Sequence, residues 1–136
     1  MGQSKRFSRS TVLVAGNDDE QRALAATLFE ESGFRVVECA SAEAAAAVID
    51  ARRAEIVMIF SDIGLSGRMD GVDLARIASA KAPGVPVIVT SGASGERLHD
   101  LPDSTEHMRK PWRALDLLIR AERVRADHPV WRGDIL

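Results

Sequence analysis

Five short apolar runs recur along the chain, and each ends at a polar or glycine-containing segment. They lie at residues 11–15, 34–39, 55–61, 87–91 and 105–109. Short apolar runs bounded by turn residues predict strands that are buried on both faces of a parallel sheet. The third run is the most apolar and should lie at the centre of the sheet. The mixed second run predicts an edge strand, and the fifth run is the weakest.

Helix-like segments separate these runs. They lie at residues 19–32, 42–53, 71–80 and 113–126. In the first segment, Ala25, Leu28 and Phe29 form an apolar stripe at spacings of three and four, which is typical of a helix that packs on a core. Ser41 and Asp70 precede the second and third segments and are good N-cap residues. The chain therefore alternates between strands and helices along its whole length.

This alternation of five strands with helices predicts a single α/β domain of the (βα)5 type, with a parallel sheet, right-handed crossovers and helices on both faces. We expect the doubly wound, flavodoxin-like strand order 2-1-3-4-5. The domain should span residues 11–126. A flexible N-terminal segment, 1–10, would precede it, and a tail, 127–136, would follow it.

The composition excludes several function classes. The net charge of −2 favours neither nucleic acid nor an anionic membrane as a partner. No apolar run approaches the ~20 residues that a membrane helix needs. Cys39 is the only cysteine, so an internal disulfide cannot form and a reducing compartment is the simpler reading. We expect a cytoplasmic protein in which Cys39 is a small buried hydrophobe.

Candidate chemistry follows the strands, because the functional crevice of an open α/β sheet lies beyond the carboxyl ends of its strands. Asp62 follows the third strand, Ser91 ends the fourth, and Lys110 follows the fifth. An acid-rich loop, 16–19, follows the first strand. A carboxylate nucleophile, a hydroxyl and an ammonium group on one sheet edge suit phosphoryl transfer.

At this point the sequence resembles a known family, the receiver domain of bacterial response regulators. The resemblance covers about residues 11–126. The stretches that carry it are "FSDIGLSGRMDG" after the third strand, "VPVIVTSG" at the fourth, and "MRKPW" at the fifth. Each motif is weak alone, but their order and spacing together are specific.

The resemblance implies a role for each of these residues. Asp62 matches the phosphoacceptor, which takes a phosphoryl group from a histidine kinase or a histidine phosphotransfer protein. Ser91 matches the switch hydroxyl, and Lys110 matches the lysine that contacts the phosphoryl group. His107 stands where the family carries its rotating aromatic switch residue. The peptide bond between Lys110 and Pro111 is expected to be cis, as is frequent in this family.

The chain departs from the family directly after the first strand, where receivers carry two acidic residues. Residues 12–33 fit the family pattern without a gap, and this register places Gly16 and Asn17 at the two acid positions. Asp18 and Asp19 fall just beyond them. A one-residue slip would bring the acids back, but it would turn the apolar side chains of the strand to the wrong faces.

The resemblance also implies a Mg²⁺ site, with Asp62, Asn17 and the backbone carbonyl of Gly64 as ligands. Mg²⁺ binds in proteins mainly through one or two carboxylates. Gly16 offers no side-chain ligand and Asn17 offers no charge, so binding should be weakened. Asp18 is a further candidate ligand, directly or through a water molecule.

The acids Asp18 and Asp19 have a simpler alternative role at the start of the first helix. Asp18 with Gln21 three residues later fits a capping box, and acids in a first turn suit the helix dipole. Capping is expected to be the main role of one of the two acids.

Two hypotheses for function follow. The first is a single-domain receiver of a phosphorelay that accepts a phosphoryl group on Asp62, with at most self-phosphorylation and autodephosphorylation as enzyme activity. The second is a degenerate receiver that binds proteins without being phosphorylated. Both predict a downstream protein partner and no direct contact with nucleic acid or membrane, and they leave open a homodimer. A flavodoxin-like ligand binder is disfavoured because the loop after the first strand lacks serine- and threonine-rich phosphate contacts.

The segment between the fourth and fifth strands is shorter than the family usually has. The helix expected there should therefore be reduced, with only a short helix-like piece near residues 96–101. Any output surface that uses this helix would be altered.

Overall fold

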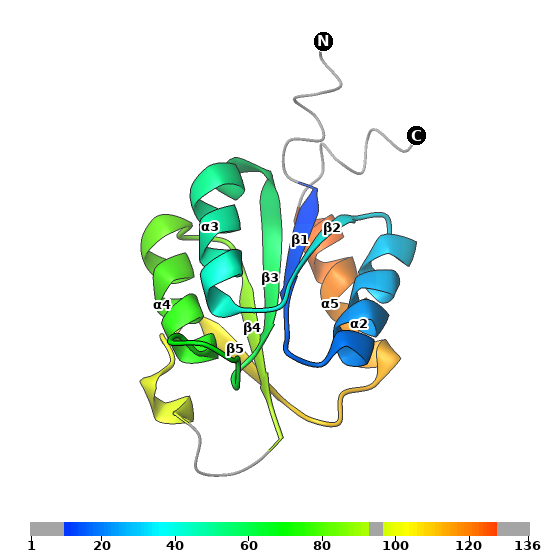
Figure 1. The fold of residues 1–136 in the computed structure, drawn as a ribbon. Helices are drawn as coiled ribbons and strands as arrows, with labels where there is room; N and C mark the ends of the chain where they lie inside the picture. The colour runs from blue at the N-terminus through cyan, green and yellow to red at the C-terminus, as the bar shows by residue number, and fades with distance from the viewer. Residues whose placement is uncertain (1–9, 93–96, 128–136) are drawn as a thin grey trace.

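A five-stranded parallel sheet runs through the part of the chain that the computed structural model describes, which is residues 10–92 and 97–127 (Figure 1). The strands are β1 (Thr11–Ala15), β2 (Arg35–Cys39), β3 (Ile56–Asp62), β4 (Val87–Ser91) and β5 (Thr105–Arg109). Their order is β2-β1-β3-β4-β5, with every neighbouring pair parallel. The predicted order and the edge position of the second strand are confirmed.

Four α-helices in the described part of the chain cover the two faces of the sheet. They are α2 (Asp19–Glu31), α3 (Ala42–Arg52), α4 (Gly71–Lys81) and α5 (Ala114–Ala126). Helices α3 and α4 lie on one face, and α2 and α5 lie on the other (Figure 1). The predicted helices are confirmed, with ends that differ by one residue. None of these helices has the length and apolar character that crossing a bilayer requires.

Short 3-10 turns complete the secondary structure, η1 (Arg53–Glu55) after α3 and η2 (Leu98–Asp100) between β4 and β5. Residues 93–96 lie outside the described residues, and the rest of that connection holds only η2. Within these limits, the prediction of a reduced helix before the fifth strand is confirmed.

The predicted terminal segments lie almost wholly outside the described residues, which leave out 1–9 and 128–136. His128 and Trp131 belong to the latter. Ser10, which the sequence placed in the flexible segment, is buried and accepts a hydrogen bond from the backbone N–H of Arg35 (3.0 Å). The pairing of β1 with β2 thus begins one residue before the strand.

Side-chain caps fix where the helices begin. The Asp18 carboxylate accepts a hydrogen bond from the backbone N–H of Gln21 at the start of α2 (3.0 Å). Ser41 caps α3 in the same way. Asp70 caps α4 within a reciprocal capping box that Asp73 completes. The predicted N-caps are therefore confirmed, and these side chains satisfy backbone donors that a helix leaves without partners.

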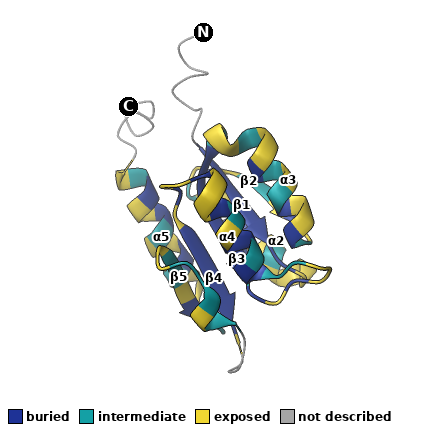
Figure 2. Ribbon diagram, turned by 90° about the vertical axis from the view of Figure 1, so that its left-hand side faces the viewer, coloured by how far each residue is buried: buried dark blue, intermediate teal, exposed yellow. Residues whose placement is uncertain are grey.

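The core divides into two apolar layers because successive side chains of a strand point to opposite faces of the sheet. On β1, Val12 and Val14 pack beneath α2 and α5, whereas Leu13 and Ala15 pack beneath α3 and α4. Figure 2 shows the buried strands between helices whose outer surfaces are exposed. Cys39 is buried in the second of these layers, as predicted, and burial raises the pKa of its thiol.

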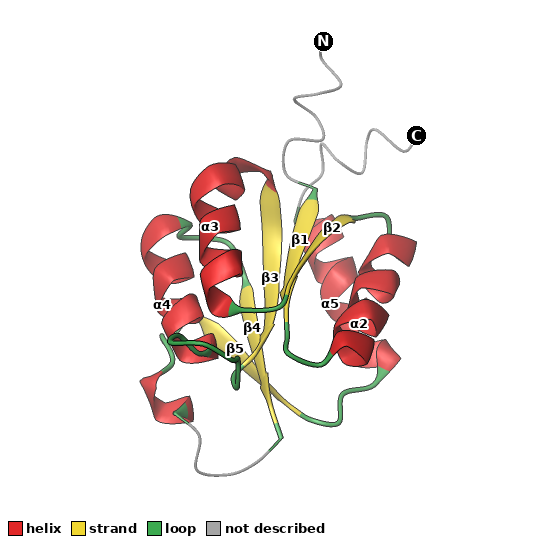
Figure 3. Cartoon of the chain, viewed as in Figure 1, coloured by secondary structure: helices red, strands yellow, loops and turns green. Residues whose placement is uncertain are grey.

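The carboxyl ends of the strands meet at one edge of the sheet, the lower edge in Figure 3. The loops β1–α2, β3–α4 and β5–α5 gather there (Figure 3). This arrangement brings together the residues that the sequence singled out after each strand.

Candidate functional site

Asp62 is the last residue of β3, and its side chain is 14% exposed. Its Oδ1 atom lies 2.9 Å from Nζ of Lys110, which is 27% exposed. The same oxygen accepts a hydrogen bond from the hydroxyl of Thr90 (2.7 Å). The Asp62 carboxylate, at the carboxyl edge of the sheet, thus contacts one cation and one neutral donor.

Lys110 follows β5 and is placed by backbone contacts. Its N–H donates to the carbonyl of Ser91 at the end of β4 (2.8 Å). The peptide bond between Lys110 and Pro111 is cis, as the resemblance implied. With its backbone bonded to the end of β4, Lys110 extends its side chain past β4 to Asp62 on β3.

Thr90 is a site residue that the sequence reasoning missed. The sequence pointed to Ser91, but the Ser91 hydroxyl lies 2.6 Å from Nε2 of His107. Thr90 reaches Asp62 because the two residues are partners in the β3–β4 register and therefore point to the same face. The two predicted switch residues, Ser91 and His107, thus contact each other. The only sequence signal for Thr90 was its place beside Ser91 in a pair of hydroxyl residues.

Two glycines bring backbone close to Asp62. A Cβ atom at Gly16 would lie 3.1 Å from Oδ2 of Asp62, so position 16 faces this carboxylate. A Cβ atom at Gly71 would lie 2.3 Å from the Asp62 carbonyl oxygen, a distance that no side chain tolerates. The first turn of α4 therefore packs directly on the end of β3.

Asn17 contacts the loop that follows Asp62. Its Nδ2 donates to the carbonyl of Gly64 (3.0 Å). Its Oδ1 accepts from both the N–H and the hydroxyl of Ser66, at 2.8 Å and 3.0 Å. Gly16 and Asn17 are thus the residues of the β1–α2 loop that face Asp62 and its loop, as the gapless register predicted.

The two acids after Asn17 are engaged at the start of α2. Asp18 caps the helix through the N–H of Gln21, and Asp19 forms an ion pair with Arg22 (2.8 Å). Arg22 also donates to the carbonyl of Gly16 (2.7 Å). The cap at Asp18 consists of the one hydrogen bond from the Gln21 N–H, without the return bond from the Gln21 side chain to the Asp18 backbone N–H that a capping box would add.

Comparison with known proteins decides the family. The family model of the response regulator receiver domain matches residues 12–117. The chain belongs to the response regulator receiver family. It is a receiver of two-component signalling, and the family assignment made from the sequence is confirmed.

Two of the proteins that this receiver resembles are NtrX proteins. The nitrogen assimilation regulatory protein NtrX of Azorhizobium caulinodans is 35% identical over 82 residues, which are 60% of this chain and 18% of NtrX. The receiver thus spans less than a fifth of that relative. The solved receiver domain of NtrX from Brucella abortus is 27% identical, with a TM-score of 0.71, and the match covers 83% of this chain and 96% of that domain.

A response regulator receiver protein from Sinorhizobium medicae has the same fold. Its TM-score is 0.78 at 21% identity, and the match covers 88% of this chain and 97% of that protein. Receivers of this family interact with histidine kinases or phosphotransfer proteins and with downstream partners, and they generally bind Mg²⁺ at an acidic site.

The donor set of this receiver does not fit a Mg²⁺ ion. Among residues 10–92 and 97–127, no three His, Cys, Asp or Glu side chains group so as to hold a metal. Of the ligands that the resemblance implied, Asp62 is paired with Lys110, and the Gly64 carbonyl accepts from Asn17. Asp18 caps α2. One engaged carboxylate and neutral oxygens are a poor set for an ion that relies on carboxylates.

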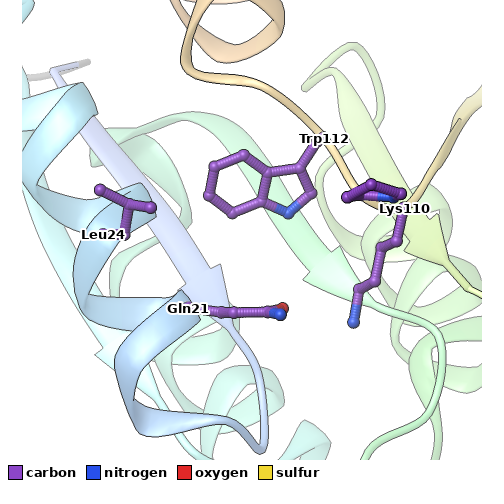
Figure 4. A pocket seen from close by; sticks show the side chains of 5 residues that line it. Gln21, Leu24, Lys110 and Trp112 are labelled. Atoms are coloured by element: carbon purple, nitrogen blue, oxygen red, sulfur yellow. The ribbon is translucent and has the colours of Figure 1, made fainter.

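A cavity of about 290 Å³ opens beside the site, between α2 and the β5–α5 loop. It is lined by Gln21, Leu24, Lys110, Pro111 and Trp112 (Figure 4). In Figure 4, the amide of Gln21 and the ammonium of Lys110 extend into the same space, below the Trp112 ring. Trp112 in turn packs edge to face on Phe60, with ring centroids 5.9 Å apart.

Proposed function

We propose that this receiver accepts a phosphoryl group on Asp62 from the phosphohistidine of a histidine kinase or a histidine phosphotransfer protein, as a single-domain member of a phosphorelay. The observation that carries the proposal is the contact between Asp62 and Lys110, 2.9 Å, at the carboxyl edge of the sheet. A partly buried carboxylate beside a fixed cation is suited to attack on phosphorus.

The proposed step uses the free side of the carboxylate. Both Lys110 and Thr90 contact Oδ1, whereas Oδ2 faces Gly16, a residue without a side chain. Oδ2 would form the new bond to phosphorus as the bond from phosphorus to the imidazole nitrogen breaks, and the imidazole keeps that electron pair. The Lys110 ammonium would offset charge on the phosphoryl oxygens.

The proposal is tested by intact-mass measurement after incubation with the phosphodonor acetyl phosphate. The wild-type protein should gain the mass of one phosphoryl group, and Asp62→Asn should gain none. Incubations with Mg²⁺ and with EDTA are run side by side. An adduct that persists in Asp62→Asn, or no adduct under either condition, would contradict phosphorylation at Asp62.

A pair of lysine variants tests the role of the cation. Lys110→Met should slow formation of the adduct by about 10²-fold, because it removes the charge beside Asp62. Lys81→Met is the matched control, since Lys81 pairs with Asp50 on the surface at the far end of α4. If the adduct forms at equal rates in both lysine variants, Lys110 does not assist the transfer.

The neutral residues at the two positions that follow β1 favour a second candidate, a degenerate receiver that binds its partner without phosphorylation. Gly16 and Asn17 stand where the family carries acids, and Asn17 is engaged with Ser66. In this case acetyl phosphate adds no phosphoryl group to the protein, and the downstream protein partner binds wild type and Asp62→Asn with equal affinity.

The receiver would span residues 11–126, between the segments 1–10 and 127–136, and would act in the cytoplasm. Its partners would be the phosphodonor protein and a downstream protein, with no direct nucleic acid and no membrane. A homodimer stays an open alternative, which sedimentation of wild type and Asp62→Asn would address.

A further inference from the structure

The loop after Asp62, residues 63–70, is held to the sheet edge from two sides. On the first side, both the nitrogen and the oxygen of the Asn17 carboxamide form hydrogen bonds to the loop. Nδ2 donates to the Gly64 carbonyl (3.0 Å), and Oδ1 accepts from the Ser66 N–H (2.8 Å) and hydroxyl (3.0 Å). These three hydrogen bonds, called here the Asn17 bridge, join the β1–α2 loop to the β3–α4 loop.

On the other side, Glu43 in the first turn of α3 holds the same loop. Its Oε2 accepts the backbone N–H groups of Arg68 (3.0 Å) and Met69 (3.2 Å). Gly67 permits this approach with a φ of 102°, and a Cβ atom there would lie 2.9 Å from Glu43 Oε1. The loop therefore has fixed anchors before and after its glycine turn.

The Asn17 bridge occupies groups that the resemblance assigned to a cation. A metal ion at this edge would need the Gly64 carbonyl, which already accepts from Asn17, and an oxygen of Asn17 that already has two donors. At Asp62 it would find only one oxygen, Oδ2, because Oδ1 is already held by Lys110 and Thr90. Displacing these contacts leaves polar groups to be satisfied elsewhere, which is unfavourable.

We propose that Asn17 is a positioning residue that takes the structural place of the metal ion, so that the loop after Asp62 is ordered without a cation. As a statement about the phosphoacceptor site, this inference rests on the proposed function. The ordering itself does not require Asp62 to be phosphorylated.

Amide hydrogen exchange in EDTA tests the bridge directly. The Ser66 amide should exchange about tenfold faster in Asn17→Ala, since the variant removes its acceptor. Ser66→Ala, which removes one of the three hydrogen bonds, should have a smaller effect. The Leu74 amide, which donates to Asp70 within α4, is the internal control and should be unaffected. Ser79→Ala, on the exposed side of α4, is the matched serine control.

Addition of Mg²⁺ gives the second readout. In wild type, 10 mM Mg²⁺ should leave the exchange of the Ser66 amide and the melting temperature unchanged. Asn17→Asp should be less protected in EDTA, because a carboxylate cannot donate to Gly64. Its protection should return with Mg²⁺, which it should bind about tenfold more tightly than wild type. The double variant Asn17→Asp with Asp62→Asn should lose that response.

Two outcomes would overturn the inference. One is a wild-type Ser66 amide that becomes protected only when Mg²⁺ is added, and the other is unchanged exchange in Asn17→Ala. Neither outcome bears on whether acetyl phosphate modifies Asp62. Conversely, absence of an adduct would leave the exchange results standing, so the two proposals fail separately.

Discussion

At the scale of single residues, Gly71 lies where the first turn of α4 meets the end of β3. Gly71→Ala should destabilise the protein by about 1–3 kcal/mol, because a Cβ atom 2.3 Å from the Asp62 carbonyl forces backbone apart. Helix propensity acts in the opposite direction and is worth at most about 1 kcal/mol. Urea unfolding measures the difference.

Gly92→Ala is the control for this substitution, since the atoms nearest to a Cβ at Gly92 belong to Lys110 at 3.9 Å. It should change the free energy of unfolding by less than about 0.5 kcal/mol. Equal losses in the two variants would contradict the close packing at Gly71.

Glu43 gives the site a pH dependence that can be measured. Its pKa lies below the ordinary value, first because the carboxylate accepts a hydrogen bond from its own backbone N–H, and further because it accepts those of Arg68 and Met69. A carboxylate with a lowered folded-state pKa contributes stability above its unfolded pKa of about 4.3, and this contribution is lost as the pH falls through the folded-state pKa.

Glu43→Gln should therefore lower the melting temperature at neutral pH, and its difference from wild type should shrink below about pH 4. Melting curves between neutral and acidic pH provide the measurement. Glu30→Gln, on the exposed surface of α2, is the control and should show no such convergence. A difference that is constant with pH would mean that the charge of Glu43 does not hold the loop.

At the scale of elements, two neighbouring acids at the start of α2 have different roles. Asp18→Ala should cost about 1 kcal/mol, because it removes the acceptor for the Gln21 N–H. Asp19→Ala should cost less than about 0.5 kcal/mol, since the Asp19 side chain is 85% exposed in its ion pair with Arg22. Chemical denaturation distinguishes the two. A Mg²⁺ response that changes in Asp18→Ala would make Asp18 a ligand instead of a cap.

The elements also show what the sequence could predict. The apolar runs located all five strands because a parallel sheet buries both of their faces, and the convergence of Asp62 and Lys110 followed from the shared edge. Thr90 was missed because the side to which it points depends on the register between β3 and β4. The resemblance placed Asn17 and the Gly64 carbonyl at one site, but as ligands of a shared ion. The direct hydrogen bonds from Asn17 to Gly64 and Ser66 were missed because these residues lie 47 and 49 positions away along the chain.

At the scale of the whole molecule, the apolar layer beneath α2 and α5 extends from the core to Trp112, which lines the cavity beside the site. Phe29 is fully buried and packs edge to face on Phe60, with ring centroids 5.7 Å apart, and Phe60 contacts Trp112. Phe29→Ala should lower the free energy of unfolding by about 3–5 kcal/mol, a large fraction of the 5–15 kcal/mol that typical domains have.

The measurement uses urea unfolding followed by fluorescence in a Trp131→Phe background, which leaves Trp112 as the only tryptophan. Leu24→Ala, at a side chain that is 52% exposed on the same helix, should cost less than about 1 kcal/mol. If the two variants unfold at the same urea concentration, Phe29 is not a central element of this layer.

The Asn17 bridge has a consequence for the chemical ageing of the protein. Asn17 is the only asparagine in the sequence, and asparagine is among the thermolabile residues because its side chain loses ammonia to give an acid. Deamidation here would create a carboxylate at the position where the family carries one. The reaction needs the carboxamide to rotate toward the following backbone nitrogen, and its hydrogen bonds to Gly64 and Ser66 oppose that rotation. Folding thus protects the one asparagine whose deamidation would place a carboxylate at one of the two acid positions, while Gly16 leaves the other without a side chain.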